Sequence, residues 1–143
     1  MSGFSADWLA LREPADAVAR NPELTTRLID WRRKYGALSV LDLGSGTGAN
    51  YRFLAPRLGG EQHWRLVDHD PALLAEIGWR CDSPGETACL DLAGPWQVLE
   101  KSPVDLVTAS ALLDLVSMDW LERLTRYSQA WQAAVFMVLS YDG

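Results

Sequence analysis

The chain has 143 residues, a length that fits one domain with a substantial core and does not fit two. Hydrophobic residues make up 48% and charged residues 22%, which excludes an intrinsically disordered chain. The formal net charge of −6 argues against nonspecific binding to nucleic acid, and the longest apolar run, 133–139, is too short to cross a membrane.

The amino terminus has no basic region followed by an apolar run, so it does not have the pattern of a signal peptide. The two cysteines, Cys81 and Cys89, lack the spacing of metal ligands and are typical of reduced thiols. The sequence therefore predicts a soluble, cytoplasmic protein without a metal site.

Residues 1–36 carry helix signals and are expected to form a helical lid on a single domain, 1–143. Ser5 is a candidate cap for a short helix through Leu11, and Pro14 is expected to open a second helix. Asn21 and Pro22 then start a further helix. The residues of this helix predicted to face the core recur at helical spacing: Leu24, Leu28, Trp31 and Tyr35.

From residue 37 onward, apolar stretches that favour strands alternate with stretches that favour helices. The predicted strands cover 37–43, 63–68, 87–90, 104–109 and 133–139. The predicted helices cover 49–57, 71–77, 96–100 and 118–129. Strands that alternate with helices imply right-handed crossovers and a parallel sheet covered on both faces, so the predicted fold is α/β, Rossmann-like and doubly wound.

The first predicted strand ends in Asp42 and is followed by glycines at alternate positions, Gly44, Gly46 and Gly48. Glycine lets the chain turn sharply and lets the backbone approach a ligand closely, because no Cβ intervenes. The helix that follows has its first N–H groups free to face a carboxylate or phosphate. The loop therefore predicts a ligand site.

Other polar residues follow the remaining strands, at the sheet edge where α/β proteins bind their ligands. The second strand ends in Asp68, with His69 next, and the third is followed by Asp91 and Leu92. Ser110 follows the fourth predicted strand. An acidic residue at the end of the second strand can accept hydrogen bonds from ribose hydroxyls.

This ordered set of motifs, from about Ala37 to Leu139, resembles the class I S-adenosylmethionine-dependent methyltransferases. The resemblance implies the strand order 3-2-1-4-5 and S-adenosylmethionine as cofactor. It implies that the glycine loop holds the methionine part, that Asp42 supports its ammonium group, and that Asp68 binds the ribose. It also places adenine beside Asp91 and Leu92, and the transferred methyl group near Ser110. The predicted cofactor-binding residues are Asp42, Gly44, Ser45, Gly46, Gly48, Asp68, His69, Asp91, Leu92 and Ser110.

An NAD-dependent oxidoreductase is the alternative enzyme class. Residues 44–49 also satisfy the dinucleotide pattern G-x-G-x-x-A, and Asp68 lies at about the expected spacing of ~20 residues. Against it stands Asp42, which would repel a pyrophosphate and attract an ammonium group. Asp91 adds a second anchor for adenosine that a dinucleotide does not require.

Methyl transfer requires chiefly alignment and exclusion of water, so few catalytic residues are needed. The candidates for a general base, by position, are Asp114, His69 and Tyr141, with Asp142 next to it. The net charge predicts a small-molecule acceptor rather than nucleic acid. Polar residues of the amino-terminal segment are expected to fold over the cofactor and help form the acceptor pocket: Arg12, Asp16 and Arg20.

The resemblance also implies a core of seven strands, whereas the sequence ends four residues after Leu139. We therefore expect either a fragment or a chain whose last two strands come from a partner, and a non-catalytic cofactor-binding half is a further alternative. Strand 133–139 would lie at the sheet edge without charge or proline, which favours pairing with another chain. A homodimer through this strand and helix 118–129 is expected.

Overall fold

A computed structural model describes residues 5–92, 94, 96, 103–112 and 117–140. Within these ranges the elements are α1 (Ala6–Ala19), α2 (Pro22–Arg32), β1 (Leu38–Leu43), α3 (Ala49–Leu58), β2 (Gln62–Asp68), α4 (Pro71–Arg80), β3 (Glu86–Cys89), β4 (Leu106–Leu112), α6 (Met118–Trp131) and β5 (Ala134–Ser140). The helix predicted at 96–100 falls almost entirely outside the described residues.

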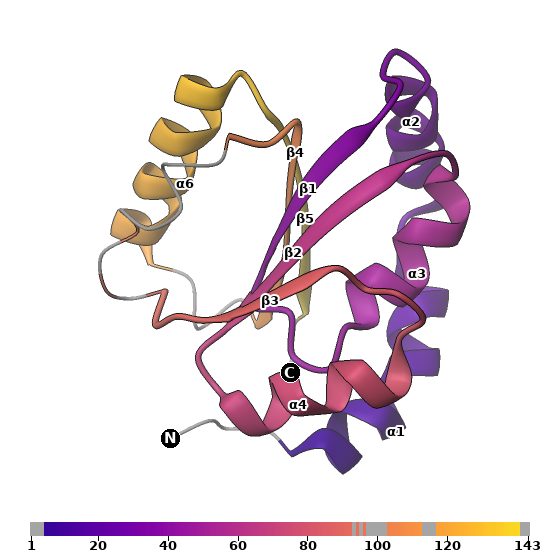
Figure 1. Cartoon of the computed structure of the whole chain (residues 1–143), viewed down its shortest axis with the longest axis vertical. Coiled ribbons are helices and arrows are strands. Elements are labelled where there is room, and N and C mark those ends of the chain that lie inside the picture. Colours follow the sequence, from indigo (N-terminus) through magenta and orange to yellow (C-terminus); the bar gives the residue numbers. More distant parts are fainter. Residues whose placement is uncertain (1–4, 93, 95, 97–102, 113–116, 141–143) are drawn as a thin grey trace.

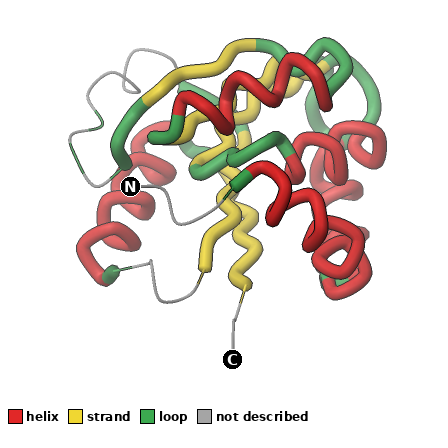
Figure 2. The backbone as a smooth tube through the Cα atoms, turned by 90° about the horizontal axis from the view of Figure 1, so that it is seen from below, coloured by secondary structure: helices red, strands yellow, loops and turns green. Residues whose placement is uncertain are grey.

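The five strands form one parallel sheet in the order β3-β2-β1-β4-β5, which confirms the predicted fold class and strand order (Figure 1). β1 lies at the centre because it is apolar on both faces, as a strand buried between two layers must be. β4 and β5 pair along seven residues each, and Figure 2 shows them side by side at the end where the chain finishes.

Alternating residues of β1 point into two hydrophobic layers. Val40 packs with residues of α2, α3 and α4, whereas Leu41 packs with Leu124 of α6. Figure 1 shows the same division, with α6 on one side of the sheet and α2 and α3 on the other. Trp64 of β2 is 4% exposed and belongs to the first layer.

The amino-terminal helices differ from the prediction in two ways. Residues 6–19 form one helix with Pro14 inside it, instead of two helices. Pro14 lacks an N–H, so the carbonyl of Ala10, four residues earlier, receives no helical hydrogen bond from it, and the helix continues past this position. Leu24 is 50% exposed and does not face the core, although Leu28 does.

The basic run 32–34 lies at the end of α2, and Arg32 within it is only 4% exposed. Its guanidinium donates hydrogen bonds to the carbonyls of Tyr35, Gly59 and Glu61, at 2.8–3.2 Å. These bonds join the end of α2 to the turn before β2. Because α2 ends at Arg32, Tyr35 lies beyond the helix, where it packs against the first hydrophobic layer.

Three helix caps are present, of which those at Ser5 and Asn21 were predicted. Ser5, Asn21 and Asp70 each accept a hydrogen bond from a backbone N–H in the first turn of α1, α2 and α4. In the described part of the chain, no helix is long and apolar enough to cross a membrane.

Candidate functional site

The glycine loop after β1 makes the predicted sharp turn at the carboxyl edge of the sheet. Gly44, Gly46 and Gly48 all have positive φ, at 71°, 56° and 93°. A Cβ on Gly46 would lie 3.3 Å from the Leu9 side chain, and one on Gly48 would lie 2.6 Å from Cys81 Sγ. The loop therefore needs glycine both for its backbone conformation and for space.

Ser45 fixes this loop to the sheet. Its buried hydroxyl donates to the Asp42 carbonyl at 2.9 Å and accepts from the Val67 N–H at 3.0 Å. The Gly44 and Ser45 N–H groups both donate to the Val67 carbonyl, at 2.8 and 2.9 Å. The Ser45 side chain thus holds the loop against β2 and is already bonded at both its donor and its acceptor.

Asp42 is completely buried beneath the loop. Its Oδ1 accepts hydrogen bonds from the Thr108 hydroxyl at 2.6 Å and from the Asn50 amide at 3.1 Å. Its Oδ2 has no hydrogen-bond partner, and neither does Asn50 Oδ1. Burial raises the pKa of Asp42, because removing a carboxylate from water disfavours its charged form. The site therefore holds an acceptor that a donor or a cation would satisfy.

Asp68, at the end of β2, is 6% exposed and binds the glycine loop. Its Oδ2 accepts from the Gly46 N–H at 2.8 Å, and its Oδ1 accepts from the Asp70 N–H at 2.9 Å. A carboxylate oxygen has two lone pairs, so each oxygen keeps capacity for a further donor. His69 is exposed, with Nδ1 3.5 Å from Asp68 Oδ1.

The other predicted residues lie along the same edge. Asp91 is exposed, and its carbonyl accepts from the Gly94 N–H, while the Leu92 carbonyl accepts from Trp96 Nε1 at 2.8 Å. Ser110 lies within β4, opposite Val138 in register, because the strand runs three residues further than predicted. The base candidates Asp114, Tyr141 and Asp142 lie outside the described residues. Nowhere in the described ranges do His, Cys, Asp or Glu side chains gather into a metal site.

An ion pair that the sequence does not predict holds α1 over the glycine loop. Arg52 of α3 donates a hydrogen bond through Nη1 to the Thr47 carbonyl at 2.6 Å and another through Nε to Glu13 Oε2 at 2.8 Å. This contact holds the pKa of Glu13 below its ordinary value. Glu13 and Arg52 are 39 residues apart, and no local sequence pattern links them. Their pairing places α1 against the glycine loop.

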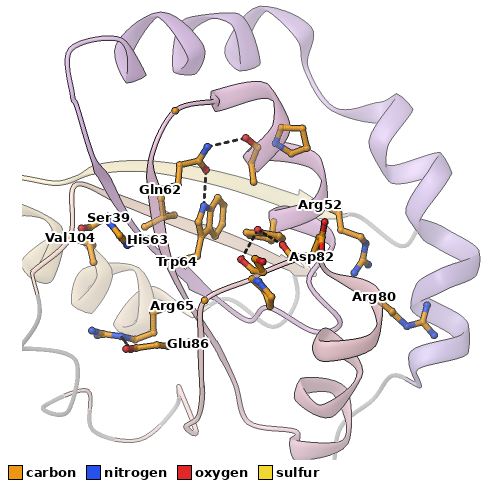
Figure 3. A pocket seen from close by; sticks show the side chains of 18 of the residues that line it. Ser39, Arg52, Gln62, His63, Trp64, Arg65, Arg80, Asp82, Glu86 and Val104 are labelled. Carbon is orange, nitrogen blue, oxygen red and sulfur yellow. Dashed lines mark hydrogen bonds and ion pairs between the residues drawn. The ribbon is translucent and has the colours of Figure 1, made fainter.

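A large cavity lies at the opposite end of the sheet, near the amino ends of β1, β2 and β3 (Figure 3). It has a volume of about 780 Å³, and its walls include Trp64 and Tyr51. Trp64 Nε1 donates to Gln62 at 2.8 Å, and the Tyr51 hydroxyl donates to the carbonyls of Asp82 and Ser83. Because these polar groups already bond one another, we assign no chemistry to this cavity.

Comparisons with known proteins rest on structure alone. No protein-family model matches the sequence, and no curated protein matches it. Solved structures do match, at sequence identities of 20% or less among those described below.

An S-adenosylmethionine-dependent methyltransferase from Clostridium acetobutylicum superposes with a TM-score of 0.62 at 16% identity, covering 93% of this chain and 55% of that one. A cyclopropane-fatty-acyl-phospholipid synthase-like protein from Lactobacillus casei gives a TM-score of 0.61 at 17% identity, covering 96% and 53%. The DhpI complex with S-adenosylhomocysteine gives a TM-score of 0.58 at 20% identity, covering 95% and 67%.

The chain therefore has the Rossmann-like fold of the class I S-adenosylmethionine-dependent methyltransferases. It spans about half the length of the first two of these solved chains. The fold agrees with the resemblance identified in the sequence, and it leaves activity and substrate to be argued from the site.

Proposed function

We propose that this chain binds S-adenosylmethionine and takes part in methyl transfer to a small-molecule acceptor. The observation that carries the proposal is the buried Asp42 carboxylate, whose Oδ2 has no partner, beneath a loop of three positive-φ glycines. An amino acid ammonium group would donate a hydrogen bond to this oxygen and stabilise its charge, which Arg20 attracts without bonding to Oδ2.

The chain's own residues fit such a cofactor at three further points. The N-terminus of α3 has no side-chain cap at Gly48, so its first N–H groups remain free to attract a carboxylate. Asp68 keeps lone pairs for ribose hydroxyls. Asp91 lies after the neighbouring strand, β3, at the edge where adenine would bind.

Bound S-adenosylmethionine supplies a methyl group on a positively charged sulfonium. The protein contributes alignment of the acceptor and exclusion of water. Leu9 of α1 lies against Gly46, and the Glu13–Arg52 ion pair holds this helix over the loop, so α1 forms a cover for the site. A base is needed only where the acceptor loses a proton, and His69 is the one exposed candidate within the described residues.

A dinucleotide fits this site less well. A pyrophosphate at the glycine loop would lie close to the buried Asp42 carboxylate, and two negative charges repel each other strongly where water is excluded. This is the same residue that favours an ammonium group.

Calorimetric titration with S-adenosylhomocysteine, NAD and NADP tests the proposal. We expect S-adenosylhomocysteine to bind most tightly. Asp68→Ala should weaken its binding by about 1–3 kcal/mol through lost hydrogen bonds to a charged group. Gly46→Val should abolish binding, because the added side chain enters the space beside Leu9. Asp30→Asn, on an exposed ion pair, is the control and should change nothing. Tighter binding of either dinucleotide would overturn the proposal.

A methylation screen then separates the two forms of the proposal. Transfer to a small-molecule pool supports a catalytic chain, whereas tight binding of S-adenosylhomocysteine without transfer supports a cofactor-binding part that requires a partner. Methyl incorporation into nucleic acid alone would contradict the expectation from the net charge of −6.

A further inference from the structure

Helix α1 leaves two large apolar side chains exposed and places several charged side chains toward α3, although Leu9 and Ala17 also lie on its inner side. Within this helix Leu11 is 81% exposed and Val18 is 88% exposed, and none of its residues is classed as buried. Its charged residues Glu13 and Asp16, together with Arg20 at its end, line a space facing α3. A helix that packs on a hydrophobic core has the opposite arrangement. The space behind α1 is therefore lined by charged side chains together with apolar ones, among them Ala17, Phe53 and Val138.

That space is a cavity of about 240 Å³ between α1 and α3, two helices that Figure 1 shows on the same side of the sheet. Ala49, which directly follows the glycine loop, forms part of its wall, and so does Val138 of β5. The cavity thus adjoins the proposed cofactor site on the side of β5. Its volume suits one charged group with a few attached carbon atoms.

The cavity is lined by more arginine side chains than carboxylates. Glu13 pairs with Arg52 through Arg52 Nε at 2.8 Å, and Asp16 pairs with Arg12 at 3.4 Å. For Arg20 and Arg57, no ion pair to an acidic residue is found in the described part of the chain. Neither arginine therefore forms a direct ion pair there, although Asp42 and Asp16 attract Arg20.

These two arginines converge on one aromatic ring. The guanidinium carbons of Arg20 and Arg57 lie 4.3 and 3.8 Å from the centre of the Phe53 ring. Arg20 Nε and Nη1 are buried without a hydrogen-bond partner, and a buried unsatisfied donor destabilises a structure. The carboxylates of Asp42, Asp16 and Glu13 attract Arg20 without reaching its donors, whereas Arg57 repels it. A bound anion would satisfy the unbonded donors of Arg20.

We infer that the cavity behind α1 binds the carboxylate or phosphate group of the acceptor, through Arg20 and Arg57 held on Phe53. A guanidinium presents paired N–H donors that match the oxygens of both anions. The inference rests on the proposed function, because it assigns the acceptor to a cavity that adjoins the cofactor site.

The test is a titration of the full chain, saturated with S-adenosylhomocysteine, with inorganic phosphate in one arm and acetate in the other. NMR signals of the arginine Nε–Hε groups report binding directly. We expect a millimolar Kd for at least one anion, weakened about tenfold or more in Arg57→Gln and in Arg20→Gln, since tenfold corresponds to about 1.4 kcal/mol. The tighter arm identifies the acceptor as a phosphate ester or a carboxylic acid. Arg33→Gln, which breaks an exposed ion pair with Asp30, should leave binding unchanged.

The outcomes separate the inference from the proposal beneath it. Absence of binding by both anions, or binding that is equally strong in the Arg20 and Arg57 variants, would overturn the inference. A loss of S-adenosylhomocysteine affinity in these variants as large as the loss for the anion would assign the arginines to the cofactor and would also overturn it. Arginine-dependent anion binding by a chain that fails to bind S-adenosylhomocysteine would retain the anion site and refute the methyltransferase proposal.

Discussion

Replacing Gly48 by alanine should destabilise the protein strongly and for two separable reasons. The residue has a φ of 93°, and its added Cβ would lie 2.6 Å from Cys81 Sγ. The left-handed backbone costs an alanine about 1–2 kcal/mol. Overpacking against the thiol adds about 1–3 kcal/mol. We therefore expect a loss of about 2–5 kcal/mol in the free energy of unfolding.

Urea unfolding of a double-mutant cycle measures the two parts. Gly48→Ala combined with Cys81→Ala removes the contact with sulfur and leaves only the backbone strain, so the two substitutions should couple favourably by about 1–3 kcal/mol. Gly36→Ala is the matched control, because nothing lies within 4 Å of its added Cβ and its φ is not positive. Additive effects in the cycle, or a Gly48→Ala variant as stable as Gly36→Ala, would refute the loop geometry described above.

Two further predictions concern charge and assembly. Burial raises the pKa of Asp42, so the folded state binds its proton more tightly than the unfolded state does, and the cofactor-free protein should lose stability as the pH rises above the ordinary value of 3.8. Asp42→Asn should remove that loss, and parallel pH profiles of urea unfolding for the two proteins would contradict the reasoning. We also propose that the outer edge of β5 pairs with a second copy of the chain, since β5 pairs only with β4 in the described part and Val135 on it is 42% exposed. Sedimentation should then show a dimer that Val135→Lys disrupts, and a monomeric parent chain at high concentration would refute this pairing.

The sequence predicted the sheet and its ligand-binding edge because local patterns determine both. The alternation of apolar strands with helices identified all five strands to within three residues at each end, and the strand order followed from the family resemblance. The alternate glycines predicted the positive-φ loop, and Asn21 with Pro22 predicted the start of α2.

Contacts between residues far apart in the sequence could not be predicted in this way. The hydroxyl of Thr108 bonds Asp42 from 66 residues away, and Arg52 reaches Glu13 across 39 residues. Neither pair has a local signal, because each depends on how the sheet and α1 pack. Arg32 is buried and bonds three backbone carbonyls, two of them 27 and 29 residues away, which no local pattern predicts.

The outward apolar face of α1 has a similar explanation. Periodicity alone predicts that apolar residues of a helix face a core, whereas here Leu11 and Val18 are exposed and the ion pair between Glu13 and Arg52 holds a charged residue inward. Arg20, expected from the sequence to help form the acceptor pocket, does line a cavity behind this helix. Its convergence with Arg57 on the Phe53 ring became visible only in three dimensions.

The most direct test of the central claim is a map of backbone amide NMR shifts during titration with S-adenosylhomocysteine. If S-adenosylhomocysteine binds at the glycine loop, we expect the largest shifts at the carboxyl edge of the sheet. They should fall on Gly44, Gly46 and Gly48 and on the residues around Asp68 and Asp91. Shifts concentrated around Trp64, in the large cavity at the amino ends of the strands, would contradict it.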